Sequence, residues 1–363
     1  MLLRMLARVL ASVAAAVAAA TAPAQHAHRT RFTVEANGDL LIHSPIYARA
    51  LALGHGRLYD FAPMLRSVRP WVAGAGLALC HVETPMGPGP PHGYPVFNTP
   101  KGLARGVAAT GWDACDTASN HTLDGGQAGV DGTIAALDRA GVRHTGSARS
   151  PAGARRIRIM HVHGVTVAYL AYTEMTNGIP PPHPWSVDLA RPRRILADAR
   201  RARRAGARAV VVNLHWGTEY RAAPDAFQLA LARRLTRSKA ITAVLGQHVH
   251  VVQPIRWMHG KPVVFGEGNL LSNQTAACCP VASQDGMLVL LRFLAGPRGV
   301  RVRRVDYVPT WVRHPDFLVV PAGSGLRHRQ AARAALIASY RRTVRIVGRS
   351  RRTAPIPRRL AGG

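Results

Sequence analysis

The sequence predicts an α/β protein with layered sheets. Short apolar segments rich in β-branched residues alternate with segments in which apolar residues recur every three to four positions. The 363 residues are enough for one large domain or two modest ones with a substantial core. Several β-prone segments end in a residue type that binds metal ions, which indicates a site at one edge of a sheet.

The first 24 residues have the features of a signal peptide. Arg4 and Arg8 precede the apolar, Ala-rich run 9–20, and Ala22-Pro23-Ala24 fits the small-residue cleavage pattern. No Cys lies directly after this apolar run, so a lipoprotein anchor is not expected. The run is shorter than the roughly 20 residues of a membrane-spanning helix. An uncleaved membrane anchor is the alternative interpretation of this segment. We expect cleavage after Ala24 and a secreted or extracytoplasmic protein.

The rest of the chain is expected to form one main domain over 25–320, then a C-terminal helix and basic tail over 321–363. In the first half, apolar β-prone runs predict strands at 31–42, 76–82 and 114–118. Helical periodicity predicts helices at 60–68, ended by Pro70, and at 129–140, ended by Gly141. The Pro- and Gly-rich segment 84–100 is a predicted loop.

The second half continues the alternation. Strands are predicted at 157–172 as a hairpin, at 209–214, 241–245 and 262–265, and within 286–308. The continuous Val run of 209–214 is typical of a strand covered on both faces. Helices are predicted at 188–205, 225–236 and 327–347. A second Pro-rich loop covers 175–187, and the basic tail 348–363 is expected to be mobile.

The four cysteines are compatible with an oxidising compartment, and sequence alone leaves their pairing open. Cys80 and Cys115 fall in predicted core strands, so we interpret them first as small buried residues. Cys278 and Cys279 lie in a loop, where one of them could pair elsewhere.

The net charge of +30 raises the question of nucleic-acid binding. Without Arg4 and Arg8, the remaining 46 basic and 18 acidic residues still leave +28. Only three basic residues are Lys, and the arginines gather on helices and tails without interleaved aromatic residues. We therefore expect a solvated basic surface and no nucleic-acid partner. Such a surface would attract anionic polymers or an anionic membrane surface by long-range steering.

Six residues of metal-binding type follow β-prone segments. They are Asp39, Glu83, Asn120, His215, His248 and His250. They lie far apart in sequence and can converge only if several strand ends meet at one edge. Two ions about 3.5–4 Å apart, joined by a bridging carboxylate, would suit such a mixed set of oxygen and imidazole ligands.

Each of these residues also has a structural interpretation. Asp39 could be a turn aspartate, and Asn120-His121 a helix cap with a hydrogen-bonded histidine. His215 could be a core histidine at the end of its strand. His248 and His250, at i and i+2, would point to one face of a strand. Their joint occurrence favours a shared metal site over these separate explanations.

The order of these motifs resembles that of a known family. Gly38-Asp39, Glu83-Thr84-Pro85, Ser119-Asn120-His121-Thr122-Leu123-Asp124, His215-Trp216-Gly217-Thr218-Glu219-Tyr220 and Gly246-Gln247-His248-Val249-His250 resemble the CapA family of capsule and poly-γ-glutamate synthesis proteins. That family is similar to calcineurin-like metallophosphatases. The match covers roughly 32–292. The resemblance implies an α/β/β/α sandwich with a metal site at the C-terminal ends of the strands.

The resemblance also implies roles for individual residues. Asp39 and His250 would bind one ion and Glu83 would bridge two. Asn120, His215 and His248 would bind the second ion, and His121 would act as the acid on the leaving group. Asp124 and Glu219 would orient ligands. One or two divalent ions of Mn, Fe or Zn are implied.

The sequence departs from the family at several positions. Metallophosphatases begin with Asp-x-His, whereas here the nearest histidine, His43, follows Asp39 by four positions and is left open as a ligand. Glu83 stands for a bridging Asp. His81, before Glu83, is expected to be structural or to line the site. These departures leave the identity and number of metal ions open.

Two functions are expected from this resemblance. The first is an exported metal-dependent hydrolase or transferase acting on a phosphoester, or on an amide or ester of an envelope polymer. The second is a non-catalytic factor that binds an anionic polymer and assists its synthesis, export or attachment.

Overall fold

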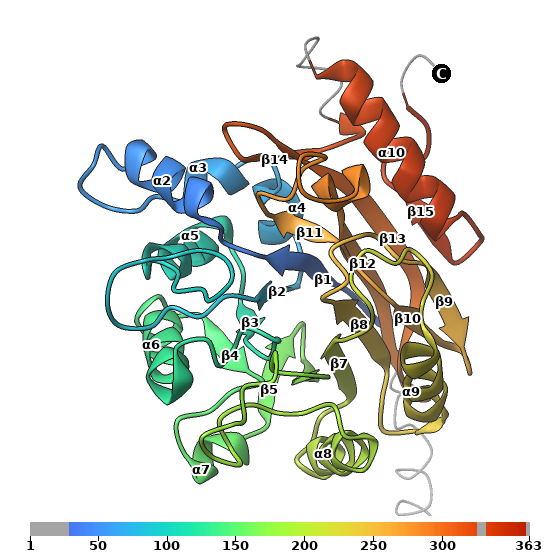
Figure 1. Cartoon of the computed structure of the whole chain (residues 1–363). Coiled ribbons are helices and arrows are strands. Elements are labelled where there is room, and N and C mark those ends of the chain that lie inside the picture. Colours follow the sequence, from blue (N-terminus) through green and yellow to red (C-terminus); the bar gives the residue numbers. More distant parts are fainter. Residues whose placement is uncertain (1–28, 325–331, 361–363) are drawn as a thin grey trace, which may run out of the picture.

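The computed structural model describes residues 29–324 and 332–360 and contains two β-sheets that face each other. Helices cover the outer faces of both sheets (Figure 1). The predicted α/β/β/α layering is therefore confirmed. The predicted signal peptide 1–24 lies outside the described residues. Among those described, no helix combines the length and apolar character needed to span a bilayer.

The first sheet has a parallel part and an antiparallel part. The parallel strands are β1 (Thr30–Leu40), β2 (Leu77–Val82), β3 (Ala114–Asp116), β4 (Arg143–Thr145) and β11 (Asn269–Leu271). The hairpin β12 (Asp285–Gly296) and β13 (Gly299–Arg313) adds antiparallel to β1, and β14 (Leu318–Pro321) and β15 (Thr353–Pro355) pair with β13. All strands predicted in this region are present.

The second sheet has the order β5-β6-β7-β8-β10-β9. Its bounds are β5 Arg158–Val162, β6 Val165–Thr173, β7 Ala209–His215, β8 Ala243–Gln247, β9 Ile255–Met258 and β10 Lys261–Val264. Strands β6, β7, β8 and β10 run parallel, and the edge strands β5 and β9 are antiparallel to their neighbours. Every residue of β7 is buried, as its Val run predicts.

Apolar side chains of both sheets form the central core between them, for example Val34 and Leu79 against Val167 and Val211. The first sheet is covered on its other face by α2 (Ser44–Leu53), α3 (Ala62–Leu65), α4 (Arg69–Ala73), α5 (Gly102–Thr110) and α6 (Gly126–Arg139). The second is covered by α8 (Pro192–Arg204) and α9 (Ala226–Arg237). A short helix α7 (Pro151–Ala154) and a 3-10 turn η1 (Val281–Gln284) complete the loops.

Several helix boundaries differ from the predictions. Pro70 does not end a helix over 60–68, because it is the second residue of α4, where its missing N–H has no intrahelical partner to lose. Helices α2 and α5 were not predicted. Gly102 is the first residue of α5, and glycine is needed there because a Cβ would lie 2.3 Å from the Tyr59 carbonyl oxygen. Helix α8 begins at Pro192 and not at 188, because Leu189 bridges to Thr173.

The C-terminal segment packs on the first sheet. Helix α10 (Arg333–Val347) contacts β13, and residues 327–331 of the predicted helix lie outside the described residues. The expectation of a mobile tail is wrong for β15, which pairs in parallel with β13. Thr353 Oγ1 accepts a hydrogen bond of 3.0 Å from Trp257 Nε1, and the Arg352 guanidinium lies 3.3 Å from the centroid of that indole.

Both pairs of cysteines form disulfides. Cys80 and Cys115 are buried as predicted, but they are joined to each other, because the register of β2 and β3 places them directly opposite. Cys278 is joined to Cys279, its neighbour in the chain, so the expectation that one of them pairs elsewhere is wrong.

Candidate metal centre

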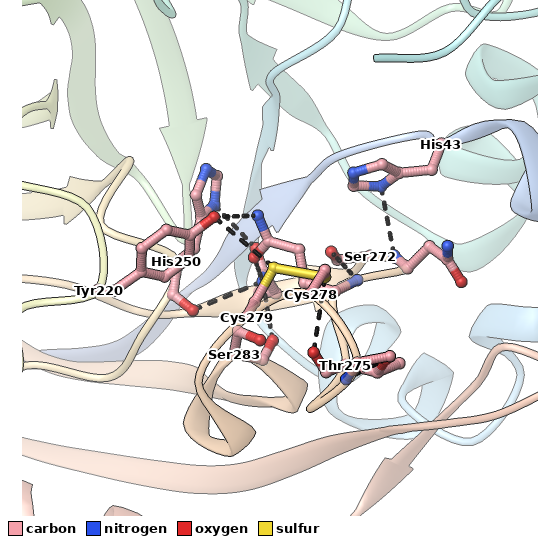
Figure 2. Close-up of a disulfide and its surroundings, with 12 residues drawn as sticks. His43, Tyr220, His250, Ser272, Thr275, Cys278, Cys279 and Ser283 are labelled. Atoms are coloured by element: carbon pink, nitrogen blue, oxygen red, sulfur yellow. Dashed lines mark hydrogen bonds between the residues drawn. A yellow bond between two sulfur atoms is a disulfide. The ribbon is translucent and has the colours of Figure 1, made fainter. Parts of the chain in front are cut away.

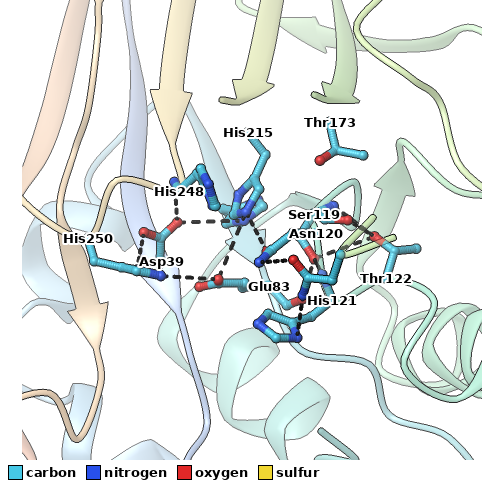
Figure 3. A network of polar contacts seen from close by, with 12 residues as sticks. Asp39, Glu83, Ser119, Asn120, His121, Thr122, Thr173, His215, His248 and His250 are labelled. Atoms are coloured by element: carbon cyan, nitrogen blue, oxygen red, sulfur yellow. Dashed lines mark hydrogen bonds and ion pairs between the residues drawn. The ribbon is translucent and has the colours of Figure 1, made fainter. Parts of the chain in front are cut away.

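The six predicted ligands converge between the C-terminal ends of strands from both sheets (Figure 3). Asp39 is near the end of β1, and Glu83 follows β2 directly. Asn120 lies in the turn after β3. From the second sheet, His215 ends β7, and His248 and His250 follow β8. All six residues are at most 3% exposed.

Gly38 allows β1 to bring Asp39 into this position. A Cβ on Gly38 would lie 1.8 Å from the carbonyl oxygen of Gly268, so only glycine fits. The close approach also lets the Asp39 N–H donate to that carbonyl at 2.9 Å. A bulge in the pairing of β1 and β2 follows Ala36 and sets the register in which Asp39 lies opposite His81.

The ligand atoms are spaced as they would be around shared cations. His250 Nε2 and His215 Nε2 lie 3.6 and 3.9 Å from the same carboxylate oxygen of Glu83. Asp39, Glu83 and His250 each place a ligand atom within 4.8 Å of the others. Two ligands held about 2.1 Å from one tetrahedral ion would be about 3.4 Å apart. The observed distances are therefore close to those expected between ligands of the same metal ion.

Other side chains of the centre face each other at hydrogen-bonding distance. His215 Nε2 lies 2.8 Å from Asn120 Oδ1, and His250 Nδ1 lies 3.2 Å from Asp39 Oδ2. Asn269 supports His250 from behind, with its Oδ1 3.0 Å from the same Nδ1. The Asn269 amide in turn donates to the Ser283 carbonyl at 2.8 Å, which fixes its orientation.

Several buried polar atoms here have no hydrogen-bond partner among the described residues. They are both carboxylate oxygens of Glu83, Nε2 of His81, and Nδ1 of His215 and of His248. A buried polar atom without a partner costs about 1–3 kcal/mol, and an unpaired charge costs more. A divalent cation would satisfy these atoms, so the donor set fits a metal centre.

The electrostatics of the centre differ between its histidines. Burial and the neighbouring imidazoles lower the pKa of His215 well below its usual range, and burial and His250 lower the pKa of His248 to about 3. Although burial opposes it, Glu83 and Asp39 raise the pKa of His250 to about 10. Burial raises the pKa of Glu83 to about 7. Neutral His215 and His248 are ready to bind metal, whereas His250 would release its proton on metal binding.

His248 and His250 do not lie on a strand as predicted. β8 ends at Gln247, and both histidines have left-handed backbone conformations, with φ of 91° and 55°. The prediction that both histidines lie on one face of a strand is therefore wrong, although both imidazoles point into the centre (Figure 3). Such conformations are costly for non-glycine residues and are found where the surrounding structure needs them for a site.

His121 lies beside the ligands and is oriented by Asp124. The Nδ1 of His121 is 2.8 Å from Oδ2 of Asp124, which also accepts the N–H of Phe97 at 2.7 Å. The Phe97 ring contacts the imidazole edge to face, with centroids 4.7 Å apart. Asn177 lies close by, with its Oδ1 3.1 Å from the Asn120 amide. This arrangement leaves Nε2 of His121 as the atom for proton transfer.

The two remaining predicted residues are at the edge of the centre. Glu219 is exposed, and a carboxylate oxygen lies within 4.8 Å of ligand atoms of His248 and His250, closer than a purely orienting role requires. His43 belongs to none of the cation-binding groups found in residues 29–324 and 332–360. Its Nδ1 accepts the Asn273 N–H at 3.3 Å.

The loop after β11 closes one side of the centre (Figure 2). Gln274 donates to the Tyr220 hydroxyl at 3.0 Å and accepts from the Asn269 amide at 2.9 Å. The Tyr220 hydroxyl also lies 3.9 Å from the sulfur of Cys279. A chain of polar contacts therefore joins the Cys278–Cys279 disulfide to Asn269 and His250.

His81 lines the centre, which is one of the two roles expected for it, and it contacts Asp116, which was not predicted. The imidazole of His81 is fully buried, with Nε2 3.6 Å from Asp39 and Nδ1 2.8 Å from Asp116. His81 was expected only to be structural or to line the site. One signal in the sequence was available, because His81 is two residues before Glu83 and i, i+2 residues share a strand face.

Comparison with known proteins identifies relatives that are named as capsule or PGA biosynthesis proteins. The chain is 25% identical over 265 residues to "Capsule biosynthesis protein CapA" from Bacillus anthracis, covering 69% of this chain and 62% of that protein. It is 29% identical over 170 residues to "PGA biosynthesis protein CapA" from Bacillus subtilis, covering 44% and 42%. The chain thus spans about two-fifths to three-fifths of these relatives.

Solved structures show similarity of fold at low identity. A putative 5'-nucleotidase from Staphylococcus aureus matches with a TM-score of 0.51 and 11% identity over 77% of this chain and 54% of that one. The calcineurin-like phosphoesterase YfkN from Bacillus subtilis matches with a TM-score of 0.49 and 16% identity over 88% and 99%.

The family comparison confirms the resemblance expected from the motifs. Residues 33–274, two-thirds of the chain, match the family described as "Bacterial capsule synthesis protein PGA_cap". The matched segment contains all six predicted ligands and His121. This chain therefore belongs to the PGA_cap family of bacterial capsule synthesis proteins.

Proposed function

We propose that this protein is an exported metal-dependent hydrolase or transferase of the CapA type, acting in the synthesis of a capsule or poly-γ-glutamate-like envelope polymer. The observation that carries the proposal is Glu83. Its carboxylate is buried, and neither oxygen has a hydrogen-bond partner in the described part of the chain. One oxygen lies within 4 Å of both His215 and His250. A carboxylate in this setting suits a bridge between two cations.

The residues around Glu83 would have different roles in the reaction. Asp39, Glu83 and His250 would hold one ion, and Glu83, Asn120, His215 and His248 a second. Bound divalent ions would supply an activated water and polarise the phosphoryl or carbonyl group under attack. His121, oriented by Asp124, would donate a proton to the leaving oxygen or nitrogen. Asn177, between Asn120 and His121, would orient the substrate.

Elemental mass spectrometry of the full chain purified without chelators or a His-tag tests the metal centre. We expect about two equivalents of Mn, Fe, Zn or a mixture. Glu83→Ala should lose at least one equivalent. Glu174→Gln is the matched control, because Glu174 is a half-buried glutamate nearby whose carboxylate accepts the Gly217 N–H. Absence of metal after incubation with these ions would refute the proposal.

Activity of the same preparations is measured on a chromogenic phosphodiester, bis(4-nitrophenyl) phosphate, and on poly-γ-glutamate. Asp39→Ala, Glu83→Ala and His250→Ala should each abolish turnover while circular dichroism stays unchanged. Full activity in all three variants would contradict the proposal.

A groove lined by arginines favours the second candidate function, non-catalytic binding of an anionic polymer. Arg29, Arg31, Arg292, Arg298, Arg301 and Arg303 line it. Among the described residues, only Arg292 of these six has an ion-pair partner, Asp306. The groove is at the N-terminal end of β1, whereas Asp39 is near its C-terminal end. At about 3.3 Å per residue, the separation of Arg31 and Asp39 along β1 places the groove roughly 26 Å from the metal centre.

Binding of poly-γ-glutamate separates this function from catalysis. Arg301→Glu with Arg303→Glu should weaken binding, and binding should fall steeply with salt and persist in a chelator. Arg200→Glu with Arg204→Glu changes the charge equally on the exposed face of α8 and should have little effect. Salt-independent binding, or equal losses in both double variants, would exclude the groove.

A further inference from the structure

We propose that His81 is itself a metal ligand, through Nε2, and that Asp116 holds it in the orientation and tautomer that ligation requires. This inference rests on the metal centre of the proposed function. It adds a fourth imidazole to that centre.

The backbone register places three residues in a row across the first sheet. Asp39 on β1 is paired with His81 on β2, and His81 is paired with Asp116 on β3. Directly paired residues of adjacent strands point to the same face, so the three side chains project together toward the second sheet. All three are fully buried. The position of the His81 imidazole therefore follows from strand pairing and not from a flexible loop.

The carboxylate of Asp116 accepts three hydrogen bonds. Its Oδ2 accepts from the Tyr169 hydroxyl at 2.7 Å and from the Asn213 amide at 2.9 Å, both in the second sheet. Its Oδ1 lies 2.8 Å from Nδ1 of His81. Because this carboxylate can only accept from the ring, Nδ1 of His81 carries a proton, and Nε2 is the ring atom left to bind a metal ion. Carboxylate–histidine pairs of this kind orient metal-binding imidazoles.

The Nε2 atom of His81 has no hydrogen-bond partner among the described residues. It lies 3.6 Å from Oδ1 of Asp39, too far for a hydrogen bond and close to the separation of two ligands on one tetrahedral ion. Asp39, His81 and His215 each offer a ligand atom within 4.8 Å of the others. The imidazoles of His81 and His215 stack with centroids 4.8 Å apart, so the two rings lie directly against each other.

An additional imidazole changes which metals the centre prefers. Nitrogen ligands suit Zn²⁺ and Fe²⁺, whereas carboxylate and carbonyl oxygens suit Mg²⁺ and Mn²⁺. His81→Gln should therefore weaken Zn²⁺ binding more than Mn²⁺ binding. Asp116→Asn keeps the imidazole but lets its orientation relax. Loss of a carboxylate that holds a metal-binding imidazole typically costs about 10–100-fold in affinity.

The test is metal affinity of the full chain, measured by competition with a chromophoric chelator, with the d–d spectrum of bound Co²⁺ as a second readout. We expect His81→Gln to weaken Zn²⁺ binding by at least about 100-fold and to change the Co²⁺ spectrum, and Asp116→Asn to weaken it about 10–100-fold. His144→Gln is the control, since His144 is a buried histidine on the adjacent strand β4 that belongs to none of the cation-binding groups. Unchanged affinity and spectrum in His81→Gln would overturn the inference.

A structure of zinc-loaded wild-type protein, with the ions located by anomalous scattering, tests the inference even if the variants fail to fold. We expect an ion about 2.1 Å from Nε2 of His81. Bound ions that leave His81 without a metal contact would overturn this inference and preserve the proposed function. Wild-type protein that binds no metal would refute the proposed function itself.

Discussion

The Nδ1 atom of His121 lies 2.8 Å from a carboxylate oxygen of Asp124, three residues further along the chain. The Asp124 side chain is only 2% exposed and also accepts the backbone N–H of Phe97, so it is held from two sides. This carboxylate fixes the ring of His121 beside the metal ligands and leaves Nε2 as the atom that can exchange protons with a substrate.

His121→Gln should lower kcat on bis(4-nitrophenyl) phosphate by about 10²–10⁴-fold, the range expected for loss of a positioned general acid. The number of bound metal ions should not change, because His121 is not among the ligand groups. Asp124→Asn should lower kcat less. Elemental analysis alongside steady-state kinetics checks this prediction, and a parallel loss of metal in His121→Gln would instead identify His121 as a ligand.

Divalent metal should stabilise the folded protein, because its ligands are dispersed in the unfolded chain and binding to the native state is linked to folding. At a free metal concentration 100 times the Kd, the gain is about 2.7 kcal/mol. Calorimetry with Zn²⁺ and with a chelator should show a Tm difference of several degrees. The difference should shrink as the pH falls, because protons compete for His250, whose pKa is raised to about 10. An equal Tm with and without metal would argue against ligation by folded-state residues.

The Cys80–Cys115 disulfide should contribute substantially to stability, because its two residues are 35 positions apart. Closing a loop of that length is worth about 4 kcal/mol in the chain-entropy model. The double variant Cys80→Ala, Cys115→Ala should therefore lose up to about 4 kcal/mol in free energy of unfolding, measured by urea denaturation. Cys278→Ala with Cys279→Ala provides a control, since those residues are adjacent in sequence and close no loop. Equal losses in both pairs would contradict the loop-closure explanation.

His144 should make the protein less stable in acid. Burial, and then the nearby Arg158, lower its pKa to about 4, so the folded state resists protonation that the unfolded chain accepts at about 6.5. The free energy of unfolding is therefore unaffected by this group above pH 6.5. As the pH falls from 6.5 toward 4, preferential protonation of the unfolded chain lowers that free energy by at most about 3 kcal/mol.

His144→Gln should flatten the dependence of unfolding free energy on pH between 6.5 and 4. Urea denaturation at several pH values measures this slope. The exposed His161 provides a matched substitution, His161→Gln, which should leave the slope unchanged. A slope that His144→Gln does not alter would assign the acid sensitivity to other groups.

Residue types and strand ends allowed the main features of the centre to be predicted. Glu83 and His215 follow strongly apolar runs, and Asp39 follows an alternating β-prone segment. Parallel strands in layered sheets bring such ends together. This reasoning depends only on local sequence and a general rule of topology, and it found all six residues that converge in Figure 3.

The contributions of His81 and Asp116 could not be recognised in the same way. Their contact depends on the register between β2 and β3, which pairs residues 35 positions apart, and a shift of one residue would turn the side chains to opposite faces. The pairing of β15 with β13 is equally non-local, so the basic composition of the tail suggested mobility where the structure has a strand.

The same register places the Cys80–Cys115 bond where it can hold the strands of the metal centre together. The bond is one residue from the His81–Asp116 contact, on the opposite face of the same two strands. Disulfides of this kind form outside the reducing cytosol. In an oxidising compartment, which the proposed export implies, this bond would add a covalent cross-link to the backbone hydrogen bonds between β2 and β3. Reduction of the bond would therefore loosen the row of Asp39, His81 and Asp116 that faces the metal centre.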